Sequence, residues 1–244
     1  MMRLIRNCPH DNEIVTFYTE QDGERRIIKA SSNPSGIEQL KQEFSGWEWY
    51  QSKRYPDYEG QLCSIIRDSE HYVRISIRYI EGRKEKYRDG IQKNSQLINN
   101  VIRHYCKIWQ GSNSNRYPLH GDMSVDNVIV NHEGVHIIDW EHFSFDASPF
   151  GFDSYNLLFE QLFFSMEGRK KLRRSELDIL LDNIRLIRAS SEDSLYFSHD
   201  PLLAFQRFVR MNAGLWKNQI HRLPALLFNE EKTRMIDRMI ISHI

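Results

Sequence analysis

The sequence predicts an α+β protein with two domains: a β-rich part over residues 1–81 and a mainly helical part over residues 82–244. Two observations predict this division. Short runs of β-branched and aromatic residues with tight-turn signals fill the first part, which is typical of antiparallel strands. Apolar residues at helical spacing dominate the second part, apart from strand-like runs near residues 128–138. A chain of 244 residues is long enough for one or two small domains with a substantial core.

The composition excludes several classes of protein. Lysine and arginine number 33 and so do aspartate and glutamate, so no basic surface for nucleic acid or an anionic membrane is predicted. No apolar stretch is long enough to predict a transmembrane segment. The three cysteines are scattered and unpaired by spacing, which favours the reducing cytoplasm. We therefore expect a cytoplasmic protein, and nothing in the pattern indicates an oligomeric state.

The first predicted element is a β-hairpin over residues 13–30. Ile14–Thr19 and Arg26–Lys29 read as strands, and Asp22-Gly23 between them is a strong two-residue turn signal. Lys29 closes the second strand. A lysine at a strand end is usually a surface residue, but this one lies one strand ahead of a predicted helix.

That helix follows Asn33-Pro34, which can cap its first turn. Its apolar face repeats at spacings of three, four and three residues: Ile37, Leu40, Phe44 and Trp47. Glu43 and Glu48 border the face on opposite sides, roughly 80° and 60° from its centre. Either glutamate could reach a lysine on a neighbouring sheet, and the angle alone does not choose between them.

Further elements follow in order. Residues 61–66 and 72–80 read as strands, and the charged run Arg83–Arg88 suits a change of domain. Helices are predicted from residue 94 or 95 to about 109, over 156–166 and over 175–190. The last two strand-like runs, Val128–Val130 and Val135–Ile138, enclose a loop that ends in Gly134.

Polar residues flank those two strands at regular distances. Asp122 lies five residues before Asn127, and Asp139 lies twelve residues after Asn127. With a three-residue loop, Asn131 would face Val135 and Asn127 would face Asp139. An amide and a carboxylate oxygen would then meet, and these suffice for Mg²⁺, which takes hard oxygen ligands and keeps several waters. Phosphoryl transfer from ATP uses one carboxylate near the acceptor hydroxyl, with an Asn and a second carboxylate on the metal.

His120-Gly121-Asp122 and Ile138-Asp139-Trp140-Glu141 resemble motifs of the aminoglycoside phosphotransferase and choline kinase group, which has a two-lobed, protein-kinase-like fold. The resemblance implies an ATP- and Mg²⁺-dependent phosphotransferase, with the nucleotide between an antiparallel β-sheet lobe and a helical lobe. It implies that Asp122 is the catalytic carboxylate and that His120 orders its loop. Asn127 and Asp139 would be the Mg²⁺ ligands.

The same resemblance implies roles outside the motif. Lys29 would contact the donor phosphates and be held by Glu43, because the glutamate of this family lies mid-helix, rather than by Glu48. The backbone of Tyr79 and Ile80 would contact adenine. Asp153 would anchor the catalytic loop through backbone N–H groups.

One departure supports a second hypothesis. The segment expected to cover the phosphates, residues 7–12, has no glycine for close backbone approach. The alternative is therefore a catalytically weak or inactive kinase-like nucleotide-binding regulator or scaffold. A protein kinase is not favoured, because no long activation segment or Ala-Pro-Glu follows Asp139. The histidines His132, His136 and His142 lack the partners of a transition-metal site.

The expected partner is a small molecule that carries a hydroxyl acceptor. An aminoglycoside, choline or another amino alcohol, a sugar and a saccharide precursor of the cell envelope all fit the motif equally. Trp216-Lys217-Asn218 could line the acceptor site, because late helices build that pocket in the family.

Overall fold

The computed structural model describes residues 2–7, 13–21, 23–109, 116–191, 196–216 and 223–243. The chain forms two compact units: unit 1 comprises residues up to Glu81 together with Asp139–Ser144, and unit 2 comprises Gly82–Ile138 and Phe145–Ile244. Glu81 ends the first stretch of unit 1 and is also the predicted end of the N-terminal domain, whereas Asp139–Ser144, predicted to lie in the C-terminal domain, belongs to unit 1. The division into two functional domains stays a prediction. The predicted α+β class is confirmed, with an antiparallel sheet in unit 1 and a mainly helical unit 2.

Unit 1 contains a five-stranded sheet in the order β1-β2-β3-β5-β4. Its strands are antiparallel neighbours, with bounds β1 Met2–Asn7, β2 Val15–Gln21, β3 Glu24–Ser31, β4 Cys63–Ser69 and β5 Tyr72–Arg78. Gln21 pairs with Glu24, so the β2–β3 connection is the two-residue turn that the sequence predicts. Gly23 there has a φ of +79°, a conformation that glycine adopts without steric cost. Strand β1 was not predicted.

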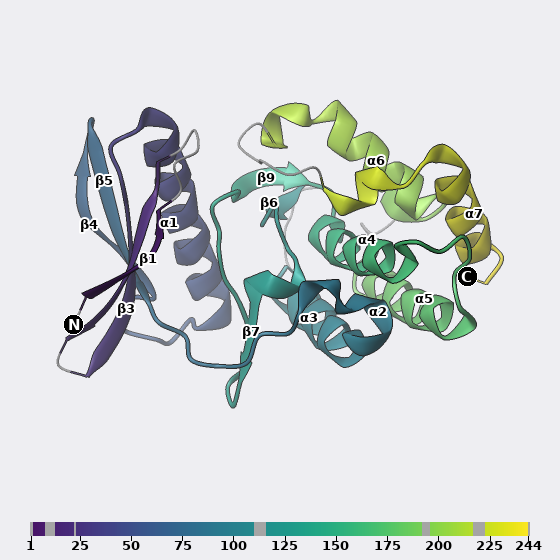
Figure 1. The fold of residues 1–244 in the computed structure, drawn as a ribbon, viewed down its shortest axis with the longest axis horizontal. Helices are drawn as coiled ribbons and strands as arrows, with labels where there is room; N and C mark the ends of the chain where they lie inside the picture. Colours follow the sequence, from purple (N-terminus) through teal and green to yellow (C-terminus); the bar gives the residue numbers. More distant parts are fainter. Residues whose placement is uncertain are drawn as a thin grey trace. The chain divides into compact units, whose positions relative to one another are not determined.

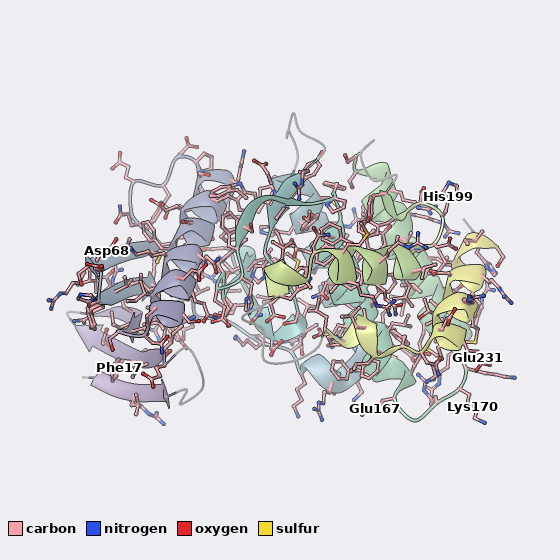
Figure 2. All side chains as sticks on the ribbon, turned by 90° about the horizontal axis from the view of Figure 1, so that it is seen from above. Phe17, Asp68, Glu167, Lys170, His199 and Glu231 are labelled. Carbon is pink, nitrogen blue, oxygen red and sulfur yellow. The ribbon has the colours of Figure 1, made fainter. Side chains whose placement is uncertain are left out.

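Helix α1, Pro34–Arg54, packs against β3, β4 and β5 (Figure 1). The Asn33 side chain accepts a hydrogen bond from the Ser35 N–H at 2.9 Å and so caps the first turn. Leu40 and Trp47 of the predicted apolar face are buried. At the edge of the sheet, Asp68 of β4, labelled in Figure 2, forms an ion pair with Lys41 of α1 at 2.9 Å.

The segment Asp139–Ser144 joins unit 1 because its aromatic residues pack on α1. The Trp140 ring lies 5.1 Å from the Tyr50 ring and 5.8 Å from the Trp49 ring, and Phe143 also lies 5.8 Å from Trp49. Gly46 makes this approach possible, because a Cβ there would lie 2.6 Å from the Cβ of Trp140. The residues that follow Asp139 are therefore held on the helix that carries Glu43.

Unit 2 is built around helix α4, Phe152–Met166, which is buried along most of its length and contacts α2, α3, α5 and α6 (Figure 1). The other helices are α2 Gly90–Lys93, α3 Ser95–Ile108, α5 Arg174–Ala189, α6 Pro201–Met211 and α7 Glu230–Ile241. The helices predicted near 95–109, 156–166 and 175–190 are confirmed. Over the described part of the chain, no helix combines the length and apolarity needed to cross a membrane.

Two small sheets complete the fold, and one corrects a prediction. Strand β6, Tyr117–Leu119, pairs with β9, Ser144–Ser148, and β7, Val128–Asn131, pairs with β8, Gly134–Ile137. Asn131 pairs with Gly134, so the β7–β8 loop has two residues rather than the predicted three. The Asn131 side chain accepts a hydrogen bond from the Glu133 N–H at 2.8 Å, which closes this tighter turn.

The shorter loop shifts the register by one residue. Asn127 lies opposite Ile138, whose N–H donates to the Asn127 carbonyl at 2.9 Å. The prediction that Asn127 faces Asp139 across the ladder was therefore wrong. The ladder places Asn127 beside the residue that precedes Asp139.

Candidate active site

The lysine at position 29 lies on the face of the sheet that α1 covers. Its cross-strand partners are Thr16 on β2 and the buried Ile75 on β5, and such partners point to the same face. The Lys29 ammonium donates to both carboxylate oxygens of Glu43, each at 2.8 Å. Glu48 is exposed. The predicted choice of Glu43 as the partner is confirmed, whereas the role of the pair toward a nucleotide stays a prediction.

A second carboxylate reaches the same ammonium. Lys29 Nζ lies 2.8 Å from Asp139 Oδ1, so residues from β3, α1 and the segment after β8 converge on one atom. Burial alone would lower the pKa of Lys29, but Asp139, Glu43 and Glu141 outweigh burial and raise it. Burial also raises the pKa of Glu43, an effect that the Lys29 charge opposes. Lys29 is therefore a permanent cation between carboxylates.

Asp139 has an unusual backbone conformation. Its φ is +65°, in the left-handed region that non-glycine residues rarely adopt, although Asp tolerates it better than most. The packing of Trp140 and Phe143 on α1 supplies the contacts that maintain this conformation. The position of the Asp139 carboxylate therefore depends on the aromatic residues that follow it.

In unit 2, hydrogen bonds to Asp153 hold the loop that contains Asp122. The Asp153 carboxylate accepts hydrogen bonds from the His120 N–H at 2.9 Å and the Gly121 N–H at 3.0 Å. Asp153 is fully buried, and burial raises its pKa to about 7 against the opposing effect of the two N–H donors. The predicted anchoring of the loop by this aspartate is confirmed.

Both ring nitrogens of His120 are used for structure. The Asp122 N–H donates to Nδ1 at 3.3 Å, so the hydrogen of the neutral ring lies on Nε2. Nε2 then donates to the Ile138 carbonyl at 3.0 Å. His120 therefore connects the Asp122 loop to the end of β8, as expected for a residue that orders the loop.

Asp122 and Asn127 contact one another directly. The Asn127 Nδ2 group donates to the Asp122 carbonyl at 2.8 Å and to the Asp122 carboxylate at 3.1 Å. Because these bonds engage the amide nitrogen, they set the amide orientation and direct the Asn127 Oδ1 atom away from Asp122. An amide oxygen of this kind and the Asp139 carboxylate are hard donors that suit Mg²⁺. The chemistry of these two oxygen donors therefore fits the implied metal, and their joint role stays a prediction.

Strand β5 ends at Arg78, so Tyr79 and Ile80 lie after the strand and not within it, as the predicted strand over 72–80 had placed them. The Tyr79 N–H donates to the Arg25 carbonyl at 3.0 Å, and the Tyr79 ring packs edge-on against Tyr18. That N–H is used within the sheet. The prediction of adenine binding by this segment therefore concerns the Tyr79 carbonyl and the peptide groups of Ile80.

Other sequence predictions fall partly outside the described residues. Residues 8–12 of the expected phosphate-covering segment, and Lys217 and Asn218, lie outside them. Trp216 stacks on Phe152 with ring centroids 5.4 Å apart. His136 Nε2 lies 2.8 Å from Asn131 Oδ1 and so belongs to the β7–β8 turn.

No model of a known protein family matches the chain. A search of curated proteins also finds no match. Solved structures do match, at low identity. One is APH(2″)-IIa in a ternary complex with streptomycin and ATP, at 11% identity and a TM-score of 0.47, covering 88% of this chain and 93% of that chain.

Two further solved structures show the same range of similarity. A thermostable mutant of aminoglycoside phosphotransferase APH(4)-Ia, with AMP-PNP and hygromycin B, has 9% identity and a TM-score of 0.44, covering 98% of this chain and 93% of that chain. Spectinomycin phosphotransferase APH(9)-Ia, with ADP and spectinomycin, has 14% identity and a TM-score of 0.40, covering 98% and 93%. At these values the likeness by itself assigns no function to this chain.

Two residues near the Asp122 loop were missed in the sequence. Asn156 and Glu160 follow Asp153 on α4 at helical spacing, and both are buried. A signal was present, because residues 153, 156 and 160 share one face of a helix whose other residues are mostly apolar. The sequence predicts only that Asn156–Met166 is helical.

Proposed function

We propose that this protein is an ATP- and Mg²⁺-dependent phosphotransferase that moves the γ-phosphoryl group to a hydroxyl of a small molecule. The observation that carries the proposal is the convergence of Glu43 and Asp139 on Lys29. Phosphoryl transfer depends on positioning and charge stabilisation, which a fixed cation beside a metal-binding carboxylate supplies.

On the donor side, Lys29 would bind the α- and β-phosphates. Glu43 keeps the ammonium extended, because it contacts Lys29 through both of its oxygens. A bound phosphate would compete with Asp139 for Lys29 and leave that carboxylate to the cation. Asn127 and Asp139 would hold Mg²⁺, which neutralises the negative charge of the phosphate oxygens. The backbone of Tyr79 and Ile80 would bind adenine.

On the acceptor side, Asp122 would accept the proton of the attacking hydroxyl. The acceptor oxygen then forms a bond to the γ-phosphorus as the bond to the ADP oxygen breaks. The hydrogen bond from Asn127 orients the Asp122 carboxylate for this step. The acceptor classes that we propose are amino alcohols, aminoglycosides and sugar-like hydroxyl compounds.

The glycine-free segment at residues 7–12 favours a second candidate, a nucleotide-binding regulator or scaffold with little or no catalysis. Both candidates require ATP to bind, but they differ in turnover.

The test combines binding with turnover. Titration calorimetry with ATP, with and without Mg²⁺, measures nucleotide binding, and ADP release in a broad panel of hydroxyl compounds measures transfer. We expect Mg²⁺-dependent ATP binding and acceptor-dependent ADP release that is lost in Asp122→Asn. Binding without acceptor-dependent ADP release would favour the regulator. Absence of both binding and turnover would contradict both candidates.

A further inference from the structure

Helix α4 carries three buried polar residues on one face. Asp153, Asn156 and Glu160 stand at positions i, i+3 and i+7, so they project from the same side of the helix. Most of the buried residues around them on α4 are apolar, including Leu157, Leu158 and Phe159, and the other buried polar residues of the helix are Ser154 and Gln161. We call Asp153, Asn156 and Glu160 the α4 polar stripe.

Each member of the α4 polar stripe contacts the backbone of the Asp122 loop at a different point. Asp153 accepts the N–H groups of His120 and Gly121. Asn156 Nδ2 donates to the Met123 carbonyl at 3.2 Å. Glu160 accepts a hydrogen bond from the Val125 N–H. Successive members of the α4 polar stripe therefore contact successive residues of the loop, and the contacted residues lie on both sides of Asp122 in the sequence.

Helix stability does not explain why polar residues occupy these buried positions. Asn156 is 2% exposed, and its Oδ1 atom is buried without a hydrogen-bond partner among the described residues. An unpaired buried acceptor costs free energy, and an apolar residue of similar size would avoid that cost. The polar residue at this position is better explained by the contact that its amide makes with the loop.

Glu160 also connects the loop to a second buried group. Gln161 Nε2 donates to Glu160 at 3.3 Å, and Gln161 Oε1 accepts from Asn94 at 2.8 Å. Asn94 in turn donates to the Lys86 carbonyl at 3.1 Å. A chain of hydrogen bonds thus runs from the Asp122 loop to the segment that opens unit 2. Nearby, Lys84 Nζ donates to the Asp126 carbonyl at 2.7 Å.

We propose that Asn156 and Glu160 are positioning residues that, together with Asp153, hold the backbone of residues 120–125 so that the Asp122 carboxylate is fixed for phosphoryl transfer. This inference rests on the proposed function for its catalytic consequence. Its structural consequence, a rigid Asp122 loop, does not depend on activity.

The charge state of Glu160 gives the proposal a second measurable consequence. Burial raises the pKa of Glu160 to about 8, and the ionisable groups that act on it are Asp126 and Asp122, both in the loop. Gln161, which contacts Glu160, and Asn94, which contacts Gln161, are uncharged. Ionisation above pH 8 would place a third negative charge beside these two carboxylates. Glu160→Gln keeps the shape and remains neutral.

The experiment measures backbone hydrogen exchange and turnover on the same proteins. Asn156→Leu removes the donor to Met123, and Glu160→Leu removes the acceptor for Val125. We expect exchange in residues 119–127 to rise about tenfold, and kcat to fall about tenfold or more with little change in KM for ATP, because the loop contacts the acceptor. Glu160→Gln should match the wild type near pH 7 and retain more of its activity at pH 9.

Two matched controls separate positioning from general destabilisation. Asn183 on α5 is a buried asparagine whose Nδ2 donates to the Ile179 carbonyl at 2.8 Å, so Asn183→Leu is the counterpart of Asn156→Leu. Glu176 on α5 is a buried glutamate that accepts the Arg173 N–H at 2.9 Å, so Glu176→Leu is the counterpart of Glu160→Leu. Both controls should leave exchange in residues 119–127 unchanged.

The outcomes are distinguishable. Unchanged exchange in both stripe variants, or an equal rise in the controls, would overturn the proposal. If the wild type shows no transfer with any acceptor, the proposed function fails, yet a selective rise in loop exchange would still support the positioning role. If exchange rises selectively but kcat is unchanged, the stripe orders the loop without positioning Asp122, and the proposal is wrong.

Discussion

Lys29 Nζ lies 2.8 Å from Asp139 Oδ1, although 110 residues separate the two in the chain. Glu43 contacts the same ammonium, and Glu141 adds to the negative potential around it. One cation therefore stands among several carboxylates, and the local charge is negative. A triphosphate that approaches this group would be repelled unless a divalent cation offsets the carboxylates.

The first prediction concerns this charge balance. Removal of Mg²⁺ should weaken ATP binding by about tenfold or more, since two like charges a few ångströms apart repel by about 1–4 kcal/mol near a protein surface. Asp139→Asn removes one charge and keeps a residue that tolerates a positive φ. It should lessen the dependence of ATP binding on Mg²⁺ and abolish turnover. Calorimetry with EDTA or Mg²⁺ measures the first effect.

Asp146→Asn is the matched control for this prediction. Asp146 is an exposed aspartate that also has a positive φ, of +46°. The Asp146→Asn variant should bind ATP with the same Mg²⁺ dependence as the wild type. Equal Mg²⁺ dependence in wild type and Asp139→Asn would remove Asp139 from the metal site.

The second prediction tests the partner of Lys29. Glu43→Gln removes a charge from the buried pair, so that Asp139 is the charged carboxylate still in contact with Lys29. The ammonium should therefore shift toward Asp139, and turnover should fall at least about tenfold. Glu48→Gln, five residues along the same helix but exposed, should retain activity. A turnover assay on both variants decides the matter, and a larger loss in the Glu48 variant would contradict the assignment.

Particular residues show what could be predicted from the sequence. Strand order and helix periodicity predicted that Lys29 could meet Glu43 or Glu48, and the choice of Glu43 followed from the family resemblance. The anchoring by Asp153 followed from the family resemblance. The register of the β7–β8 hairpin was mispredicted, because a single side chain, Asn131, selects a two-residue loop over a three-residue one.

Two other features depend on tertiary contacts. Asp139–Ser144 belongs to unit 1 because Trp140 and Phe143 pack beside Gly46, a contact between segments almost a hundred residues apart along the chain. The shared helical face of Asp153, Asn156 and Glu160 is visible in the sequence, but the pattern does not show that Asn156 and Glu160 contact the Asp122 loop.

The third prediction uses the close contact at Gly46. Gly46→Ala would place a Cβ 2.6 Å from the Trp140 Cβ and 2.9 Å from the Phe143 Cβ, so the segment after Asp139 must move. We expect a loss of stability of about 1–3 kcal/mol, as for other overpacked sites, and a fall in turnover through displacement of Asp139. Gly214→Ala, whose Cβ meets nothing within 4 Å, is the control. Full activity in Gly46→Ala would show that the segment does not govern Asp139.

The fourth prediction concerns stability and pH. Burial raises the pKa of Glu160 from 4.5 to about 8, so the folded state keeps a proton that the unfolded state has lost in this window. The free energy of unfolding should therefore fall as pH rises from about 4.5 to 8, with Glu160 contributing about 1.4 kcal/mol per pH unit. Asp153, whose pKa is about 7, adds to the same trend at lower pH.

Urea unfolding at pH 5, 6.5 and 8 checks this fourth prediction. Glu160→Gln has no proton to lose, so its stability should depend less steeply on pH than that of the wild type. Asn183→Leu, which removes a buried polar side chain without an ionisable group, serves as the control and should keep the wild-type slope. Equal slopes of the unfolding free energy against pH in wild type and Glu160→Gln would contradict the raised pKa of Glu160.

The last prediction tests the role of Asp122. Asp122→Asn keeps the shape of the side chain and removes its charge, and the contacts of the loop with Asp153 and His120 do not involve the Asp122 carboxylate. The variant should therefore fold normally and bind Mg²⁺-ATP with nearly unchanged affinity. Transfer should slow by roughly 10²–10⁴-fold, the usual effect of losing a positioned acid–base group.

Asp126→Asn, which changes an exposed carboxylate four residues along the loop, is the control and should retain most of its activity. Calorimetry and ADP release on the same preparations decide the matter, since normal transfer in Asp122→Asn would remove this residue from the mechanism.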